Sequence, residues 1–299
     1  MSGPMSRRRR LRLARTVVVL IALAVGIHML TSGGATRSTA NPPARQASSS
    51  RAAPTPSPSP RTVVTNPFTQ PKVQAYLAKH PGMSATVHDL ATGKVWSYRP
   101  QAHDTMASIM KVDILETELY EHGVLHGEDL ENATGMVENS SNDDAQDLWD
   151  AEGGAVAVSA YNRRVGLTGT TPNARGFWGL STTTAADQVT LLDHLAQPNP
   201  LLSPAERHQA LRLMHTVELD QRWGVSAGLP HGTQVAIKNG WLPLDHSPGW
   251  EVNSDGIVTG NGYHDDVSVL TTGARTEAVG IKWIQGLTRL MWPLMRLSI

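Results

Sequence analysis

The sequence of 299 residues contains no cysteine. This absence excludes disulfide bonds, a thiol nucleophile, a thiolate metal site and a lipid anchor attached through cysteine. Basic and acidic residues number 26 each, so the formal net charge is zero and gives no reason to expect nucleic acid or an acidic polymer as a partner. Lysine is scarce, with 6 against 20 arginines, and each lysine is therefore informative. With 40% hydrophobic residues, the chain can form a sizeable core.

Residues 1–65 are predicted to precede the folded part. A basic cluster at residues 7–15 comes directly before the apolar run at 16–30, which is the layout of a secretory signal. Because that run is shorter than the roughly 20 residues that span a bilayer, residues 1–40 are predicted to be either a cleaved signal peptide or a retained signal anchor. Residues 41–65 are rich in Pro, Ser and Ala and predict an extended linker. We therefore expect an extracellular or cell-envelope protein that meets the membrane only through this N-terminal segment.

Residues 66–299 have the patterns of one folded domain. Helices are predicted over 66–82, over 108–122, from 183 onward, and over 203–217 and 276–292; strands are predicted within 84–100 and over 233–240, 249–260 and 265–273. The strands thus lie toward both ends of the domain and the helices in its middle. This order predicts an α+β fold, in which one antiparallel sheet is flanked by the N- and C-terminal helices and a reduced helical subdomain is formed by the middle.

Ser108 and Lys111 are three residues apart at the start of a predicted helix, which places both side chains on one face. A serine at a helix N-terminus lies near free N–H groups and the positive end of the helix dipole. The lysine stands in an apolar run, and burial would favour its neutral form, which can accept the serine proton. With 22 serines in the chain such a pair also arises by chance, so alone it is weak evidence for a nucleophile and its base.

Two more polar clusters follow along the chain. Ser140 and Asn142 stand just before a predicted helix, where they fit either a polar turn with a helix cap or a proton relay beside an amide that grips a substrate. Lys238, Asn239 and Gly240 end a β-branched strand. A lysine there is commonly only a solvated side chain, whereas the glycine would let a substrate lie against the strand edge. Neither cluster decides the function by itself.

The three clusters together, in this order, form the set Ser-x-x-Lys, Ser-x-Asn and Lys-x-Gly. From about residue 66 to the C-terminus the chain resembles the class A β-lactamase-related serine hydrolases, which belong to the penicillin-recognising serine enzymes with the β-lactamase/DD-peptidase fold. The stretches at 181–192 and 227–240 are also similar to that family. The resemblance implies a serine hydrolase that β-lactams or related amides and esters acylate. It implies a small-molecule or peptidoglycan-derived substrate, no cofactor and no metal ion, and we expect a monomer.

The resemblance implies a catalytic role for three of these side chains. Ser108 would be the acylated nucleophile, Lys111 its base or proton relay, and Ser140 the group that carries the proton to the leaving nitrogen. The positive charge of Lys238 would help to keep Lys111 neutral.

The resemblance also implies a substrate-binding role for five residues. Asn142 would hold the substrate's amide side chain, and Lys238 would supply positive charge toward the substrate carboxylate. Asn239 and Gly240 would continue this binding strand. The backbone N–H of Trp241 would form the oxyanion hole together with that of the nucleophile.

Three departures from the family pattern affect what we expect of the activity. Asn239 stands where the family usually has a hydroxyl, so an amide would have to bind the carboxylate. Residues 153–186 contain no Asp or Glu, so the omega-loop glutamate that activates the deacylating water is missing. Since general-base help is typically worth about 10²–10⁴-fold, we expect weak deacylation.

Ser108 and Ser140 are separated by a shorter helical stretch than in the β-lactamases, which predicts a more open site.

Other functions remain as alternatives. The chain could be a penicillin-binding, DD-peptidase-like cell-wall enzyme, or a non-catalytic envelope module that binds peptidoglycan or a partner. The Gly-x-Ser-x-Gly stretch at 224–228 lacks the helix that a nucleophile elbow needs, because Pro230 and Gly232 follow at once. His122 and His126 have no evident third ligand and are interpreted as ordinary surface histidines.

Overall fold

The computed structural model describes residues 62–244 and 249–298. The predicted signal segment, residues 1–40, lies outside the described residues, and so does most of the predicted linker. Strand β1 (Thr62–Val64) pairs with β9 (Arg296–Ser298), so regular structure begins inside the segment 41–65 that the sequence predicts as a linker. Among the helices of the described ranges, none is long and apolar enough to cross a membrane.

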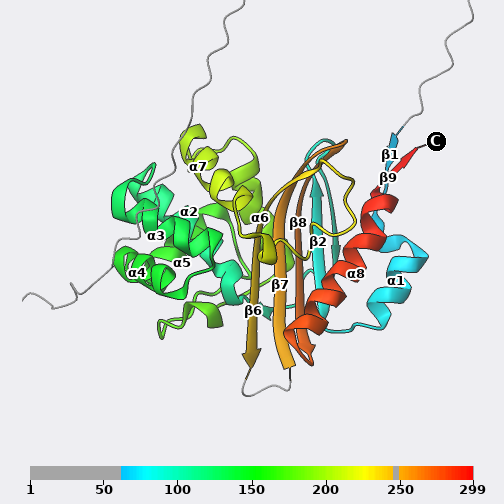
Figure 1. Ribbon diagram of the computed structural model, residues 1–299, viewed down its shortest axis with the longest axis horizontal. Coiled ribbons are helices and arrows are strands. Elements are labelled where there is room, and N and C mark those ends of the chain that lie inside the picture. Colours follow the sequence, from blue (N-terminus) through cyan, green and yellow to red (C-terminus); the bar gives the residue numbers. More distant parts are fainter. Residues whose placement is uncertain (1–61, 245–248, 299) are drawn as a thin grey trace, which may run out of the picture. The chain divides into compact units, whose positions relative to one another are not determined.

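One antiparallel sheet of five strands forms the centre of the domain (Figure 1). Its strands lie in the order β3-β2-β8-β7-β6. Their bounds are β2 Met83–Asp89, β3 Lys94–Tyr98, β6 Gln234–Leu244, β7 Gly249–Gly260 and β8 Tyr263–Ala274. The N-terminal hairpin joins the three C-terminal strands where β2 pairs with β8, with Val87 opposite Val267. The prediction that both ends of the domain share one antiparallel sheet is therefore confirmed.

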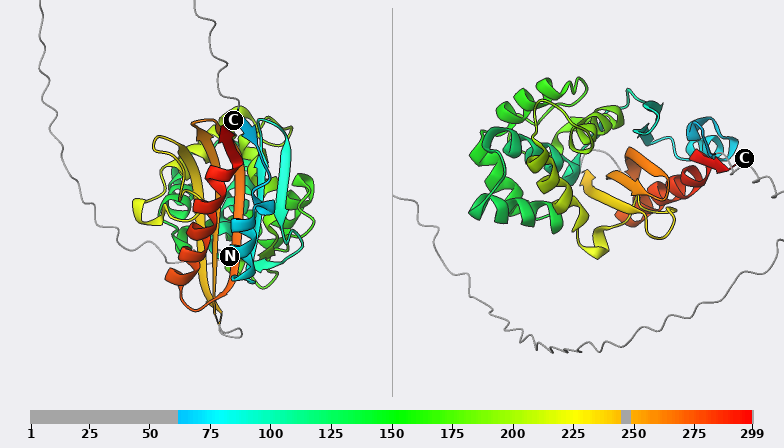
Figure 2. Two further views of the ribbon diagram at one scale, coloured as in Figure 1. Left: turned by 90° about the vertical axis from the view of Figure 1, so that its right-hand side faces the viewer. Right: turned by 90° about the horizontal axis from the view of Figure 1, so that it is seen from above.

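Helices cover both faces of this sheet (Figure 2). On one face lie α1 (Pro71–Ala78) and α8 (Glu277–Met295), which pack against each other, with α8 against β7 and β8. The other face carries the helices from the middle of the chain, namely α2 (Met110–His122), α3 (Gly127–Glu138), α4 (Asn142–Glu152), α5 (Ala155–Val165), α6 (Ala185–Ala196) and α7 (Pro204–His215). Of these, α6 packs on β2 and β8, and α7 packs beside β6. This is the predicted α+β fold.

Local capping chemistry explains where several helices begin. The Thr184 side chain accepts the Asp187 N–H at the start of α6, where the sequence predicts a helix from residue 183 onward. Ser203 and Glu206 form a reciprocal capping box at the start of α7, directly before Pro204. The first N–H groups of a helix lack intrahelical partners, and these side chains accept from them. The capping residues therefore determine where α6 and α7 begin.

Short elements connect these layers and form the surroundings of the site. They are the 3₁₀ turns η1 (Pro67–Thr69), η2 (Ala107–Ile109), η3 (Trp178–Leu180) and η4 (Leu219–Gln221), and the two-residue strands β4 (Asp104–Thr105) and β5 (Thr182–Thr183). Turn η2 lies against β6 and β7, so it brings the start of α2 to the edge strand of the sheet.

Candidate active site

The Ser108 turn lies between the sheet and α2. Ser108 is the middle residue of η2, and the α-helix proper begins at Met110, so the helix predicted from Ser108 begins with a 3₁₀ turn. The preceding Ala107 has φ of 51°, in the left-handed region that non-glycine residues rarely adopt. Asn253 on β7 donates from its amide to the Met106 carbonyl at 3.1 Å. The strained turn is thus held by the sheet, and it presents a partly exposed Ser108.

Lys111 is fully buried, as its apolar sequence neighbours predict. Its Nζ lies 2.6 Å from the Ser140 carbonyl oxygen, 3.1 Å from Ser140 Oγ and 2.9 Å from Asn142 Oδ1. Burial lowers the pKa of Lys111 to about 7, and the charge of Asp144 opposes this shift. In the ranges 62–244 and 249–298, no hydrogen bond joins Lys111 to the Ser108 hydroxyl.

Ser140 lies in a tight turn between α3 and α4. Its φ of 55° is again left-handed, and the turn closes where the Ser141 N–H donates to the Gly135 carbonyl at 3.0 Å. Ser141 then caps α4 by accepting the Asp144 N–H. The helix cap is therefore Ser141, and the candidate proton relay, Ser140, is a different serine. Asn142 is exposed and its oxygen is bound to Lys111, while within residues 62–244 and 249–298 its amide nitrogen has no hydrogen-bond partner.

Lys238 lies on β6 and is also fully buried. Its Nζ is 3.0 Å from Ser140 Oγ and 2.9 Å from the Asn239 carbonyl oxygen. Burial lowers the pKa of Lys238 well below its usual value, and the nearby charge of Lys111 lowers it further. Burial is the main cause of the lowered pKa of Lys111, and the expected help from the charge of Lys238 stays a prediction.

The Ser140 hydroxyl therefore lies between two buried amines that favour their neutral forms. The Ser140 carbonyl and Asn142 Oδ1 can only accept hydrogen bonds, so they take the two N–H groups of a neutral Lys111. The lone pair of that amine is then available to a hydroxyl proton. Such an arrangement can pass a proton through Ser140 in either direction.

Gly240 lies directly against the Ser108 turn. A Cβ placed at Gly240 would come within 2.7 Å of the backbone nitrogens of both Ser108 and Ile109, closer than real side chains approach. Glycine is therefore required for this contact between strand and turn. The contact places Trp241, the next residue of β6, beside the candidate nucleophile.

Asn239 does not offer its amide to a ligand, which corrects its predicted role in carboxylate binding. The side chain is 1% exposed. Its Nδ2 donates to the Gln221 carbonyl at 2.6 Å and to the Trp223 carbonyl at 3.1 Å. Because two carbonyl oxygens accept from it, the amide joins β6 to the preceding loop and leaves no free donor.

The loop before α6 supplies a tryptophan to the site. The ring centroid of Trp178, in η3, lies 5.0 Å from Lys111 Nζ. The Met106 N–H donates to the Ser181 carbonyl at 2.9 Å, which ties this loop to the Ser108 turn. Since residues 153–186 contain no Asp or Glu, the loop brings an indole and no carboxylate to the candidate base.

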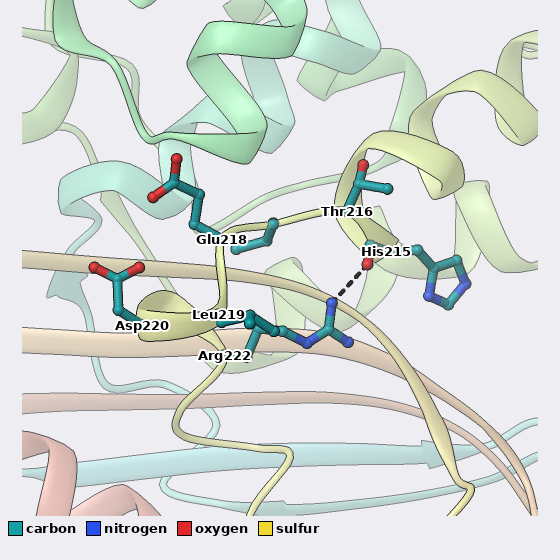
Figure 3. Close-up of a pocket in the computed structure, with 7 residues that line it drawn as sticks. His215, Thr216, Glu218, Leu219, Asp220 and Arg222 are labelled. Atoms are coloured by element: carbon teal, nitrogen blue, oxygen red, sulfur yellow. Dashed lines mark hydrogen bonds between the residues drawn. The ribbon is translucent and has the colours of Figure 1, made fainter. Parts of the chain in front are cut away.

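The segment 216–221 braces the Ser140 turn from the other side. The Glu218 N–H donates to the Glu138 carbonyl at 3.0 Å, and Gln221 Nε2 donates to the Asn139 carbonyl at 3.2 Å. A pocket of about 600 Å³ borders this segment. Figure 3 shows Arg222 there, with its guanidinium turned to the His215 carbonyl.

The structure thus brings Ser108, Lys111, Ser140 and Lys238 to one place from distant parts of the chain. Sequence reasoning missed three contributors to this geometry. Trp178 belongs to no motif, Asp144 lies within the helix predicted after Asn142, and Gln221 contributes its backbone carbonyl and one hydrogen bond from its side-chain amide. The absence of acids in the loop was the one available hint that an uncharged side chain would lie beside Lys111. His122 contacts Glu118 at 3.8 Å, and within the described part of the chain no group of three or more potential ligands is arranged to hold a metal ion.

Comparison with known proteins agrees with this geometry. Residues 129–294 match the profile of the Beta-lactamase enzyme family. Proteins named "Putative lipoprotein LppW" from Mycobacterium bovis and Mycobacterium tuberculosis are 29% identical over 186 residues. The match covers 59% of this chain and 59% of each relative, so the chain spans only about three-fifths of their length.

Solved structures show the same fold. A β-lactamase from Chitinophaga pinensis matches with a TM-score of 0.66 at 19% identity, over 77% of this chain and 99% of that protein. An ancestral class A β-lactamase matches with a TM-score of 0.61 at 23% identity, over 73% of this chain and 96% of that protein. At this level of identity the likeness establishes the architecture alone.

Proposed function

The chain belongs to the β-lactamase enzyme family, and from that premise we propose that it is an exported serine hydrolase whose nucleophile is Ser108. The observation that carries the proposal is the position of the Ser140 hydroxyl, within 3.1 Å of the amines of both Lys111 and Lys238. A purely structural serine has no need of two buried amines, whereas a proton relay does.

The proposed acylation uses these groups in turn. Ser108 Oγ attacks the carbonyl carbon of an amide or ester while its proton passes to the neutral amine of Lys111. Backbone N–H groups of Ser108 and Trp241 would stabilise the oxyanion, at roughly 3 kcal/mol per donor. When the carbon–nitrogen or carbon–oxygen bond breaks, Ser140 delivers a proton to the leaving atom and is reprotonated through Lys111 or Lys238. Asn142 would orient the substrate through its free amide.

We propose that deacylation is the slow half of the reaction. Water must attack the Ser108 ester, and a carboxylate on the loop before α6 would activate it. This loop instead supplies the indole of Trp178, whose ring centroid lies 5.0 Å from Lys111 Nζ. Without general-base help, hydrolysis of the acyl-enzyme should be about 10²–10⁴-fold slower than with it. The same observation favours a penicillin-binding, DD-peptidase-like protein as the second candidate, since such a protein forms a lasting acyl-enzyme.

The proposed location is the cell envelope or the exterior. The basic and apolar N-terminal segment supports export, and the relatives in Mycobacterium are named as lipoproteins. This sequence contains no cysteine to carry a lipid, so we propose that any attachment to the membrane runs through the N-terminal segment.

Labelling with a fluorescent penicillin and with a fluorescent fluorophosphonate tests the proposal. We expect covalent labelling of the wild-type protein by at least one probe, seen as a band on a denaturing gel. Ser108→Ala should abolish the band, while Ser226→Ala, in the rejected Gly-x-Ser-x-Gly stretch, should leave it unchanged. A protein that neither probe labels, although it is folded, would instead be the non-catalytic binding module.

A further inference from the structure

Lys238 stands opposite a carboxyl group on the neighbouring strand. In the pairing of β6 with β7, its direct partner is Asp255. Residues that oppose each other in an antiparallel ladder point to the same face of the sheet, with their Cβ atoms about 4.5–5.5 Å apart. Since Lys238 Nζ reaches the Ser140 hydroxyl, Asp255 also lies on the face that the middle helices cover. The site therefore has an acid beside its strand amine that the proposed reaction does not use.

The surroundings of Asp255 offer its carboxyl group little compensation for burial. The residue has no exposed surface. Within residues 62–244 and 249–298, neither of its carboxyl oxygens has a hydrogen-bond partner. Its partner on the other side, Ser268 of β8, is uncharged. An ionised carboxyl group buried in this way is costly unless a cation lies nearby, and Lys238 is the cation that the strand pairing places opposite it.

The charged groups around this pair act on its two members in opposite directions. Burial raises the pKa of Asp255 to about 8; the charge of Asp113 on α2 acts in the same direction and that of Lys238 against it. Asp187 on α6 in turn raises the pKa of Asp113. Burial and the charge of Lys111 lower the pKa of Lys238, and the charge of Asp255 opposes them. Each member of the pair thus favours the charged form of the other.

We propose that Asp255 is a positioning residue that supplies the counter-charge of Lys238, so that this buried amine carries the positive charge that a substrate carboxylate meets. The part of the inference that concerns the substrate rests on the proposed function. The counter-charge does not, because it depends on two side chains of the protein alone. The two parts can therefore be tested separately.

The scarcity of lysine makes the counter-charge measurable. The chain has 6 lysines, so NMR spectroscopy of protein with isotope-labelled lysine can follow each amine against pH, and the signal that Lys238→Gln removes is that of Lys238. An opposite charge within about 4–6 Å typically moves a pKa by roughly 1–3 pH units. Asp255→Asn should therefore lower the titration midpoint of Lys238 by at least about one pH unit. An unchanged or higher midpoint, or a Lys238 that is neutral at every pH at which the wild type is folded, would overturn the inference.

Asp266→Asn is the matched control for this variant. Asp266 is likewise a fully buried acid of the sheet, on β8, but the charged neighbours that act on it are Asp193 and Asp265. Its replacement should leave the Lys238 midpoint in place. A midpoint that falls equally in both variants would show a general loosening of the sheet and would contradict a specific counter-charge.

The same coupling can be measured from the carboxyl side if Asp255→Asn does not fold. By linkage, Lys238 lowers the pKa of Asp255 by as much as Asp255 raises that of Lys238. In protein with isotope-labelled aspartate, Lys238→Gln should therefore raise the midpoint of the Asp255 carboxyl group by about one pH unit or more. Lys282→Gln, which removes an exposed lysine of α8, should not change it. An Asp255 midpoint that stays in place in Lys238→Gln would overturn the inference.

Acylation by benzylpenicillin and by its methyl ester tests what the charge does for a substrate. Intact-protein mass spectrometry gives both rates at neutral pH, and the ratio of free acid to ester is compared between variants, so that the reactivities of the two compounds cancel. A hydrogen bond to a charged group exceeds a neutral one by about tenfold, so Asp255→Asn should lower this ratio by about tenfold and Asp266→Asn should leave it unchanged.

The two measurements separate the possible failures. An unchanged ratio in Asp255→Asn would overturn the part of the inference that concerns the substrate. If neither compound acylates Ser108 in the wild type while the Lys238 midpoint falls as expected, the counter-charge is confirmed and acylation by β-lactams fails.

Discussion

The Lys238 amine and the Ser140 hydroxyl are 3.0 Å apart, although 98 residues separate them in the chain. The amine comes from the edge strand of the sheet and the hydroxyl from the turn between α3 and α4. A third element, α2, contributes Lys111 to the same oxygen at 3.1 Å. Three parts of the fold thus meet at one hydroxyl, which is the group that the proposed reaction uses to pass a proton.

Ser140→Ala should slow acylation by an amide more than acylation by an activated ester. An amide nitrogen must be protonated as it leaves, whereas a para-nitrophenolate leaves without a proton. We expect a loss of about 10²–10⁴-fold with a β-lactam and a much smaller loss with para-nitrophenyl butyrate, both measured as single-turnover rates.

Ser141→Ala is the matched control for that variant. Its side chain caps α4, so its loss should cost about 1 kcal/mol of stability and leave the ratio of amide to ester rates unchanged. An equal loss for both substrates in Ser140→Ala would argue against the relay and for a role in holding the turn.

The pH dependence of acylation should report on Lys111. The base must be neutral, and the pKa of Lys111 is about 7, so the rate should rise about tenfold per pH unit well below 7 and level off above it. The charge of Asp144 raises this pKa, so Asp144→Asn should move the inflection to lower pH. The exposed Asp147, on the same helix, serves as the control through Asp147→Asn. An inflection that stays in place in Asp144→Asn would argue against Lys111 as the base, and one near 10 in the wild type would contradict the lowered pKa of this amine.

Gly240→Ala should slow the acylation of Ser108 by displacing the nucleophile. Its Cβ would lie 2.7 Å from the Ser108 nitrogen, so the strand or the turn must shift. A displacement on the order of 1 Å costs about 10²-fold in rate, and we expect a loss of that size in Ser108 acylation by para-nitrophenyl butyrate. Gly179→Ala is the control, because the nearest atom to its Cβ would be 4.0 Å away. Unchanged acylation in Gly240→Ala would show that the contact between strand and turn does not position the nucleophile.

Glu152→Gln should stabilise the protein above neutral pH. Burial and the nearby charge of Glu118 raise the pKa of Glu152 to about 11. The folded state therefore holds a proton that the unfolded state loses near pH 4.5, and stability falls as pH rises through this window. The amide removes this dependence, so the variant should gain more than about 1 kcal/mol over the wild type at pH 8 and nothing at pH 4. Urea unfolding at both pH values measures the gain, and Glu131→Gln, an exposed residue of α3, should show none.

Much of the architecture follows from local patterns. Thr184 and Ser203 cap their helices, and the alternating C-terminal segments form strands of one sheet. The sequence predicts these elements because caps and alternation depend on residues that are neighbours in the chain. The burial of Lys111 follows from its apolar neighbours in the same way.

Other features of the site depend on contacts that no local pattern encodes. Ala107 and Ser140 have left-handed φ, and both turns are held in part by distant residues, Asn253 beside the first and Gln221 beside the second. The orientation of Asn239 is decided by carbonyl groups 16 and 18 residues away, and the motif therefore predicted a ligand contact where the fold has a structural one. The position of Trp178 over Lys111 likewise requires the loop to fold back on η2.

The proposed mechanism requires that Ser108 becomes covalently acylated, and rapid-quench mass spectrometry with para-nitrophenyl butyrate measures this step. We expect one butyryl group per chain on the peptide that contains Ser108, accumulating faster than it is lost and absent in Ser108→Ala. A butyryl group on another residue, or the same adduct in Ser108→Ala, would contradict it.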